Sequence, residues 1–390
     1  MKVLVTGAKG FVGRNLCLTL EQMPDVEVLK YDLGDEARLD EYTATCDFVM
    51  HLAGVNRPKD PAEFTTGNTV FTEDILEKLA ARPNPPPVLL SSSIQAALDN
   101  DYGKSKAAAE EAVRAYGEKT GASVFIYRLA NVFGKWCRPN YNSAVGTWVY
   151  NIARDLPIMV RDPAATVTLV YIDDVVRSFV GCLDSLAAKN AENAKNAVDE
   201  DNGSMRSLRQ NEILSVSPSY TRSLGEIVEL IKSFHDEPNT LMVPNQADGF
   251  TKKLYSTYLA ALPEDKFSYS LTMHCDNRGS FTEALHSAER GQVSVNVSKP
   301  GITKGQHWHH TKHEKFLVVS GLGEINFRMA DDPNAKVITY KVSGEKLEVV
   351  RIPPGYTHNI VNIGDKDMVT VMWANEVFDP KNPDTFRLEV

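Results

Sequence analysis

The first 180 residues alternate between short apolar runs and amphipathic segments. Apolar, β-branched runs that predict buried strands occupy residues 2–5, 26–31, 48–52, 88–90 and 124–127. Apolar residues at helical spacing predict helices at residues 14–22, 72–79, 104–116 and, further on, 224–234. Strands that alternate with helices predict an α/β fold of the Rossmann type, in which helices cover both faces of a doubly wound parallel sheet.

Near residue 267 the pattern changes to short, closely spaced strands. Turn residues separate runs at 292–297, 316–319, 324–327, 337–341, 347–352 and 368–373. This spacing predicts an all-β sandwich or jelly-roll barrel. We therefore expect two domains, residues 1–243 and 267–390, joined by a linker at 244–266. A polar stretch at about 187–211 without apolar periodicity is expected to be a surface insertion.

Composition narrows the class of protein. The 390 residues are 43% hydrophobic and 24% charged, which is typical of a globular chain. A net charge of −9 disfavours nucleic acid as a partner. Five scattered cysteines without a CxxC pair predict reduced thiols and a cytoplasmic location. No apolar run reaches the roughly 18 residues of a membrane helix.

A glycine-rich turn follows the first predicted strand. Its GxxGxxG pattern includes Gly7, Gly10, Phe11, Val12 and Gly13. Glycines between a strand and a helix allow a dinucleotide diphosphate to approach the helix N-terminus. Asp32, at the end of the second strand, suits ribose hydroxyls and NAD. Positive residues that suit the 2′-phosphate of NADP are also present, so the choice stays open: Lys9, Arg14 and Arg57.

A tyrosine and a lysine at i,i+4 spacing begin a later predicted helix. Tyr102 and Lys106 share one helix face, where the ammonium stabilises a phenolate. Such a tyrosine can exchange a proton with a carbinol during hydride transfer. Three serines, residues 91–93, end the preceding strand and can hydrogen-bond the same carbonyl.

These features together resemble the extended short-chain dehydrogenase/reductases that act on nucleotide sugars, over about residues 1–240. The resemblance implies a catalytic triad of Ser93, Tyr102 and Lys106. Ser92 is an alternative to Ser93, because the nine-residue spacing to Tyr102 is short for the family. The resemblance also implies cofactor contacts from Ala53, Gly54, Tyr102 and Lys106, and a substrate contact from Asn131 in an RxxNxxG segment.

Histidines cluster in the second predicted domain. His307 and His309 alternate along a strand, so both side chains point to one side. Glu314 follows, and His358 comes from a later strand. Three imidazoles and a carboxylate without thiolates suit one divalent ion such as Zn, Mn, Fe or Ni.

This histidine pattern resembles the cupin motifs, over about residues 270–385. A finer resemblance is to the cupin-type nucleotide-sugar 3,5-epimerases, in which the residue matching His307 is a general base. His307 therefore has two candidate roles, metal ligand and base. The epimerase resemblance also assigns Arg278 and Lys304 to the diphosphate of the substrate. The metal would act either as a Lewis acid or as a structural ion.

The whole chain resembles the bifunctional epimerase/reductases of bacterial UDP-N-acetyl-L-fucosamine synthesis, a capsule and O-antigen pathway. Segments at residues 52–58, 134–142, 254–259 and 299–321 carry this closer resemblance. It implies substrate contacts from Arg138 and Asn142, a bound zinc ion and a homodimer.

The same resemblance implies the reaction. The cupin would invert C3 of UDP-2-acetamido-2,6-dideoxy-β-L-arabino-hexos-4-ulose. The first domain would then reduce C4 with NADPH, giving UDP-2-acetamido-2,6-dideoxy-β-L-talose. NADH remains an alternative cofactor.

Three other functions stay open. A redox-neutral 4-epimerase would keep its nicotinamide bound. A plain C4 reductase would use the cupin only for sugar or metal sensing or for dimerisation. A metal-dependent dioxygenase fits the cupin but matches a nucleotide-sugar partner domain poorly. A 4,6-dehydratase is disfavoured, because Ile94 and Gln95 follow Ser93 where an Asp–Glu pair would be needed.

Overall fold

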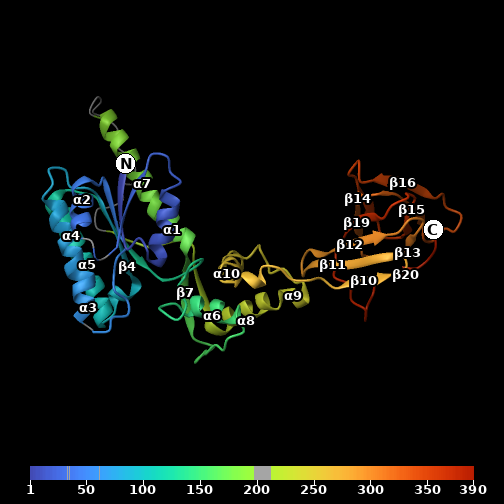
Figure 1. Ribbon diagram of the computed structural model, residues 1–390, viewed down its shortest axis with the longest axis horizontal. Coiled ribbons are helices and arrows are strands. Elements are labelled where there is room, and N and C mark those ends of the chain that lie inside the picture. The colour runs from blue at the N-terminus through green and yellow to red at the C-terminus, as the bar shows by residue number, and fades with distance from the viewer. Residues whose placement is uncertain (33, 35, 61, 197–211) are drawn as a thin grey trace. The chain divides into compact units, whose positions relative to one another are not determined.

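The computed structural model describes residues 1–390 except 33, 35, 61 and 197–211 (Figure 1). Contacts divide the chain into an N-terminal unit, residues 1–231 and 253–262, and a C-terminal unit, residues 232–252 and 263–390. The helix α10 (Gly249–Leu259) lies within the segment that we expected to be a linker. The helix α7 (Ile172–Asn196) extends into the expected insertion, and the rest of that insertion, residues 197–211, lies outside the described residues.

A six-stranded parallel sheet forms the centre of the N-terminal unit and confirms the predicted Rossmann-type fold. Its strand order is β2-β1-β3-β4-β5-β8. The bounds are β1 (Lys2–Thr6), β2 (Glu27–Tyr31), β3 (Phe48–His51), β4 (Val88–Ser93), β5 (Val124–Leu129) and β8 (Ile213–Leu214). The order reverses at β1, so a crevice for ligands lies at the carboxyl ends of β1 and β3.

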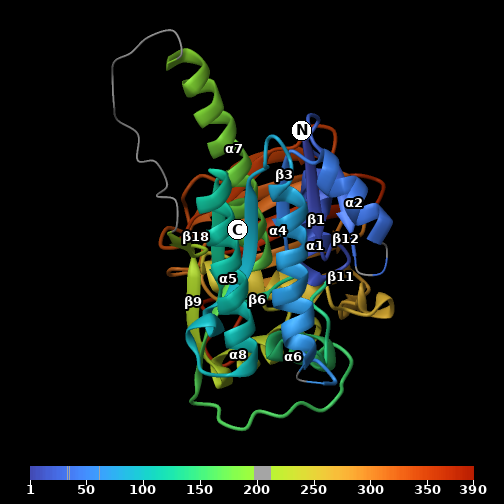
Figure 2. The same cartoon turned by 90° about the vertical axis from the view of Figure 1, so that its left-hand side faces the viewer.

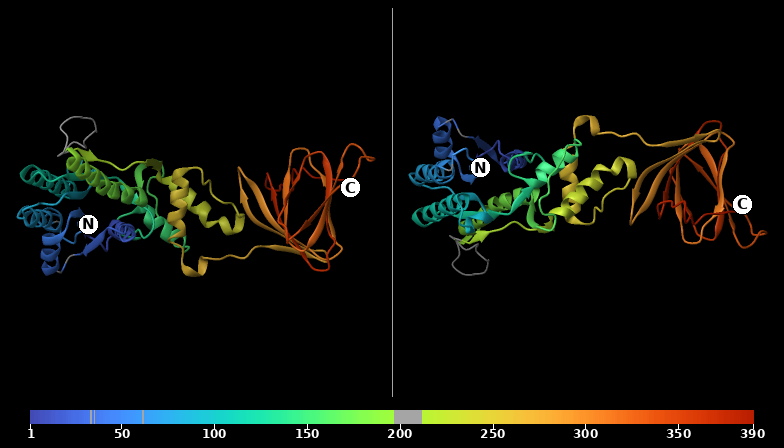
Figure 3. Two further views of the ribbon diagram at one scale, coloured as in Figure 1. Left: turned by 90° about the horizontal axis from the view of Figure 1, so that it is seen from above. Right: turned by 90° about the horizontal axis from the view of Figure 1, so that it is seen from below.

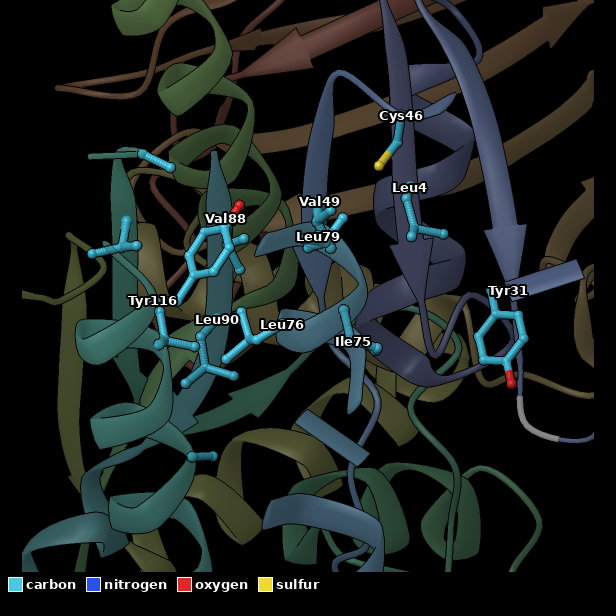
Figure 4. Packing of buried hydrophobic residues seen from close by; sticks show 14 of the residues in the cluster. Leu4, Tyr31, Cys46, Val49, Ile75, Leu76, Leu79, Val88, Leu90 and Tyr116 are labelled. Carbon is cyan, nitrogen blue, oxygen red and sulfur yellow. The ribbon is translucent and has the colours of Figure 1, made fainter. Parts of the chain in front are cut away.

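Helices cover both faces of this sheet. One face carries α2 (Glu36–Thr45), α4 (Phe71–Ala80) and α5 (Asp101–Thr120), and the other carries α1 (Phe11–Leu20) and α7 (Figure 1). Figure 2 shows α4 and α5 side by side in front of the sheet. Between them and the strands, Leu4, Val49 and Leu90 pack with Ile75 and Leu79, all at most 1% exposed (Figure 4). This core holds the strand ends, and therefore the crevice, in fixed positions.

The remaining elements of the N-terminal unit surround the carboxyl ends of the strands. A second sheet contains β6 (Asn131–Phe133), β7 (Thr166–Tyr171) and β9 (Ser219–Ser223). Short helices are α3 (Ala62–Phe64), the π-helix η1 (Thr65–Val70), the 3-10 helix η2 (Ile94–Ala97) and α6 (Ala144–Ile152). The helix α8 (Leu224–His235) begins in this unit, whereas α9 (Glu237–Thr240) and the 3-10 helix η3 (Glu264–Lys266) belong to the C-terminal unit. No helix in the described part of the chain is both long and apolar enough to cross a membrane, and the five cysteines are free.

The C-terminal unit consists of two antiparallel sheets that enclose one interior, as predicted for a jelly-roll (Figure 3). The first has the order β10-β11-β12-β19-β14-β17, and the second has the order β16-β15-β18-β13-β20. The strands are β10 (Met273–Asp276), β11 (Gly279–Ser287), β12 (Gly291–Ser298), β13 (Thr303–Trp308), β14 (Glu314–Ser320), β15 (Leu322–Met329), β16 (Ile338–Ser343), β17 (Val349–Ile352), β18 (Tyr356–Asn362), β19 (Met368–Ala374) and β20 (Phe386–Arg387).

The interior of this unit has an apolar half and a polar half. The apolar half packs Phe316 and Val318 of β14 against Ile325, Phe327 and Ile360 of the facing sheet. The polar half comes from β12, whose buried side chains are Gln292, Ser294, Asn296 and Ser298. Polar and apolar residues alternate along β12, within the predicted run at 292–297, and the polar side faces the interior. A polar interior is an environment for a ligand or an ion rather than for a purely structural core.

Candidate active sites

The glycine turn lies between β1 and α1, as expected. Gly7 has a φ of 70°, and a Cβ on Gly13 would lie 2.1 Å from the Gly7 carbonyl oxygen. Larger residues at these positions would force the turn apart. No side chain caps the N-terminus of α1 at Gly10. The first backbone N–H groups of α1 therefore remain available to a bound anion.

A cavity of about 960 Å³ extends from this turn across the carboxyl ends of the strands. The expected cofactor residues line it: Gly7, Gly10, Phe11, Val12, Gly13, Asp32, Ala53, Gly54, Tyr102 and Lys106. The Asp32 carboxylate accepts the Lys9 backbone N–H at 3.0 and 3.1 Å, which fixes it beside the turn. Lys9 and Arg14 also line the cavity, and Arg14 lies over the Trp136 ring. The cavity thus fits a dinucleotide and contains groups suited to either cofactor.

Ser93 and Tyr102 lie together in this cavity. Both residues line it, and the Ser93 side chain is close enough to offset part of the rise that burial causes in the pKa of Tyr102. Ser93 Oγ also accepts the Gln95 N–H at 3.1 Å. Ser92 points elsewhere, since its hydroxyl donates to Glu110 at 2.6 Å and only 4% of the residue is exposed. The geometry therefore favours Ser93 over Ser92 as the partner of Tyr102.

Lys106 is buried next to the same pair. Its Nζ donates to the Ser91 carbonyl at 3.2 Å and lies 6.0 Å from the centroid of the Tyr102 ring. Burial lowers the pKa of Lys106 to about 8. We expected Lys106 to lower the pKa of Tyr102, but burial raises this pKa and the Ser93 side chain offsets only part of the increase. The phenol is therefore protonated at neutral pH.

Two buried residues that the sequence did not single out organise this site. Glu110 accepts two hydrogen bonds from Arg128, at 2.8 and 2.7 Å, and one from Ser92. Asn68 lies in the π-helix η1. Its side-chain oxygen accepts the Val55 N–H, and its side-chain nitrogen donates to the Val55 carbonyl and to the Ser105 hydroxyl. Glu110 follows Lys106 by one helical turn, and this spacing could have identified it. Nothing in the sequence marks a π-helix at Asn68.

The expected substrate residues of the N-terminal unit lie along the same cavity. Asn131, Arg138 and Asn142 all line it. Asn131 donates to the Thr168 carbonyl at 3.2 Å, and the Arg138 guanidinium lies over the Tyr141 ring. Cofactor residues and candidate substrate residues thus share one continuous space, with Ser93 and Tyr102 in it.

In the C-terminal unit, His307, His309, Glu314 and His358 converge. One ligand atom from each lies within 4.8 Å of the others. Glu314 Oε2 lies 3.6 Å from His309 Nε2 and 3.4 Å from His358 Nε2. These three atoms are buried and have no hydrogen-bond partner in the described part of the chain. Buried lone pairs that face one another without donors fit a metal cation.

His307 differs from the other three residues of this cluster because its side chain is only half-buried. Burial next to two other histidines lowers the pKa of His307 to about 4, so its imidazole is neutral at neutral pH. A neutral imidazole suits both of its expected roles, ligand and base.

The two charges expected to hold the diphosphate in the C-terminal unit have protein partners. Lys304 donates to Asn296 Oδ1 at 2.7 Å and to the Val297 and Ser280 carbonyls. Arg278 pairs with Asp276 at 2.6 Å on the surface. A diphosphate would therefore have to displace existing contacts. Lys304 fits better as a support for the polar half of the interior.

Two protein families match the chain. The NAD-dependent epimerase/dehydratase family matches residues 3–196, and the polysaccharide biosynthesis C-terminal domain matches residues 274–386. The order of these matches follows the order of the two folds.

Several known proteins are similar to the chain. A Pseudomonas aeruginosa protein described as UDP-2-acetamido-2,6-beta-L-arabino-hexul-4-ose reductase is 46% identical over 396 residues, covering 100% of this chain and 99% of the relative. The crystal structure of the capsular polysaccharide assembling protein CapF from Staphylococcus aureus has 48% identity and a TM-score of 0.86, with both chains fully covered. The Bacillus subtilis spore coat polysaccharide biosynthesis protein SpsL is 25% identical over 126 residues, which cover 30% of this chain and 83% of that protein.

Replacing Gly13 with alanine tests the glycine turn. We expect Gly13→Ala to lose at least tenfold in affinity for NADPH and NADH, because its Cβ would meet the Gly7 carbonyl oxygen at 2.1 Å. Nicotinamide fluorescence on binding measures this affinity. Gly181→Ala is the control, since its added Cβ would meet no heavy atom of the described residues within 4 Å outside its own stretch of helix. Equal affinities in both variants would contradict the assignment of the turn.

Proposed function

The chain belongs to the family of the Pseudomonas aeruginosa UDP-2-acetamido-2,6-beta-L-arabino-hexul-4-ose reductase, and we propose that it carries out two reactions on one UDP-4-keto sugar. The C-terminal unit inverts C3, and the N-terminal unit then reduces C4. The observation that carries the reductase is the Ser93–Tyr102 pair in a dinucleotide-sized cavity. The observation that supports a second activity is the separate ligand cluster in the C-terminal unit.

In the reduction, Tyr102 donates the proton to O4 of the sugar. Its raised pKa keeps the phenol protonated until charge develops on O4. Ser93 orients the carbonyl, and the Lys106 ammonium stabilises the tyrosinate that remains. NADPH, when bound, supplies the hydride to C4. We propose NADPH rather than NADH because Lys9 and Arg14 both line the cavity.

In the epimerisation, a base removes the proton from C3 and a proton returns to the opposite face. The ketone at C4 makes this possible, because the carbanion is delocalised as an enolate. His309, Glu314 and His358 are the proposed zinc ligands, and His307 is either the fourth ligand or the base. Zinc binds nitrogen and oxygen donors and has no redox chemistry of its own. It would supply positive charge for the enolate oxygen.

The proposed substrate is UDP-2-acetamido-2,6-dideoxy-β-L-arabino-hexos-4-ulose, and the product is UDP-2-acetamido-2,6-dideoxy-β-L-talose. Its first support is the activity described for the Pseudomonas aeruginosa relative, UDP-2-acetamido-2,6-beta-L-arabino-hexul-4-ose reductase. Its second is the position of Asn131, Arg138 and Asn142, which we propose to contact the nucleotide sugar. Arg278 is proposed to reach the diphosphate in the second unit, where it would exchange Asp276 for phosphate oxygens.

A redox-neutral 4-epimerase is the second candidate. It is favoured by the Asp32 carboxylate, which the Lys9 backbone N–H holds where ribose hydroxyls of NAD would lie. Such an enzyme would return its hydride to the substrate and consume no cofactor. Stoichiometric oxidation of NADPH distinguishes the two candidates.

We also propose a homodimer through the outer face of the sheet that contains β12. Strand register places Val349, Leu317, Val371 and Val295 in one row across four strands. Their neighbours Phe316 and Val350 are buried in the interior, so this row faces outward. A self-complementary apolar face of this kind suits an isologous contact with a second copy.

Deuterium exchange separates the two proposed reactions. In D2O without NADPH, the wild type should incorporate deuterium at C3, and His307→Ala should not. With NADPH, His307→Ala should still oxidise the cofactor, whereas Tyr102→Phe should reduce C4 about 10² to 10⁴ times more slowly because its proton donor is missing. NMR of substrate and product provides the measurement.

The neighbouring, exposed His310 supplies the matched control, and His310→Ala should retain both activities. The zinc content of His307→Ala distinguishes a lost ligand from a lost base. A wild type that reduces C4 without exchanging C3 would disprove the epimerase and leave a plain reductase.

The pH dependence of C4 reduction reports on Lys106. Its pKa is lowered to about 8, so the ammonium is present below this pH and is lost as the pH rises through it. We expect kcat for NADPH oxidation to fall between about pH 7.5 and 9. His307→Ala should show the same alkaline limb, since the reduction does not use His307. A flat profile to pH 10 would contradict the role of Lys106.

A charge in the apolar row tests the dimer. Val371→Glu should sediment as a monomer at concentrations where the wild type is a dimer, because the carboxylate would be buried without a partner in the interface. Analytical ultracentrifugation provides the measurement, and the exposed Lys346→Glu is the control. A dimeric Val371→Glu, or a monomeric wild type, would refute this interface.

A further inference from the structure

The side chain of Asp384 organises the turn that joins two elements of the metal-ligand cluster. Its Oδ1 accepts the His310 N–H at 2.8 Å. Its Oδ2 accepts the Thr311 N–H at 2.7 Å, the Lys312 N–H at 2.8 Å and the Thr311 hydroxyl at 3.1 Å. These donors lie between His309 and Glu314, so one carboxylate sets the path of the chain from the first ligand to the second.

The backbone of Asp384 also fixes the orientation of His309. The His309 Nδ1 lies 2.5 Å from the Asp384 carbonyl oxygen. A carbonyl only accepts hydrogen bonds, so Nδ1 carries the proton and Nε2 keeps its lone pair. Nε2 is the buried, unpartnered atom that faces Glu314. The bond to Asp384 thus selects the tautomer that a metal requires.

Further contacts attach residues 384–390 to the strands that bear the ligands. The short strand β20 pairs with His307 and Trp308 of β13. Leu388 donates its N–H to the Gln306 carbonyl at 3.0 Å, and its own carbonyl accepts the Thr357 hydroxyl. Gln306 and Thr357 immediately precede the ligands His307 and His358 in the chain. The C-terminal segment is therefore part of the architecture around the cluster.

We propose that Asp384 is a positioning residue for the metal centre, which it pre-organises by holding the His309 ring in its metal-binding tautomer and the 310–312 turn in its ligating path. This inference rests on the proposed metal centre but not on the reaction assigned to it. Partners of this kind, which contact a ligand rather than the metal, typically change metal affinity by about 10- to 100-fold when they are removed. His358 provides a contrast, because neither of its ring nitrogens has a hydrogen-bond partner among the described residues.

Zinc affinity of the full chain tests the proposal. The protein is stripped of metal, and its dissociation constant for Zn²⁺ is measured by competition with a chromophoric chelator. Asp384→Ala should weaken binding about 10- to 100-fold. Asp384→Asn keeps the shape but replaces one carboxylate oxygen by an N–H donor, so it should also weaken binding. Asp379→Ala is the matched control, because Asp379 lies in the same terminal region and, among the described residues, its carboxylate accepts only the Lys381 N–H.

Cobalt(II) absorption at saturating metal distinguishes positioning from general stability. The bands of Asp384→Ala should shift as the 310–312 turn loosens and moves His309 against the Asp384 carbonyl, while NADPH oxidation by the N-terminal unit stays unchanged and the metal-free protein remains folded at the assay temperature. Affinities and spectra equal to wild type in both Asp384 variants would overturn the inference alone. A wild type that binds no zinc would overturn the metal centre and the inference together. If Asp384→Ala does not fold, the Asp384→Asn affinity and spectrum decide by the same criteria.

Discussion

The buried carboxylate of Glu110 is the interaction on which the reductase site depends. It is 1% exposed and is hydrogen-bonded to Arg128 on β5 and Ser92 on β4, so one side chain of α5 joins two strands of the sheet. Burial would raise the pKa of Glu110, but these hydrogen bonds hold it below its ordinary value. An unpaired charge at this depth would cost several kcal/mol, so the three elements keep one arrangement. Lys106 lies one helical turn before Glu110 on α5, and Ser93 follows Ser92 on β4. The fixed arrangement of these elements therefore places both residues in the cavity.

The interior of the C-terminal unit also contains polar groups that need hydrogen-bond partners. Its interior contains four polar side chains of β12, and Lys304 satisfies one of them by donating to Asn296. Because the polar side of β12 faces inward, its valines face outward and extend the apolar row on the outer face. One inversion of the usual alternation thus yields both a polar interior in the same unit as the His307, His309, Glu314 and His358 cluster and the apolar outer row proposed as a dimer contact. Polar and apolar residues still alternate along β12, but the polar residues face the interior and the valines face outward.

The sequence predicted the parts of the fold in which apolar side chains face the core. The strands at 2–5, 48–52 and 88–90 were predicted correctly, because parallel strands that are buried on both faces are continuously apolar. The bounds of β13 and β18 were not predicted, because polar side chains interrupt their apolar pattern, although the histidine spacing placed His307 and His358 on strands. His309, expected on the same strand as His307, lies one residue after the end of β13. The spacing of the histidines was enough to predict the cluster that the structure brings together. Asp384 could not be predicted, because its partners lie more than 70 residues away and are mostly backbone groups, which leave no trace in the sequence.

The order of the two proposed reactions follows from the substrate, whatever the positions of the two units. The C3 proton is acidic only while C4 is a ketone, because only then is the carbanion an enolate. Once O4 has received a proton, from Tyr102 in the proposed reduction, the sugar is an alcohol at C4 and the C3 configuration is fixed. Inversion must therefore precede reduction. The half-buried phenol of Tyr102 fits this requirement, since its raised pKa keeps it neutral, and able to donate a proton, at neutral pH. The reduction is then the step that makes the inversion permanent.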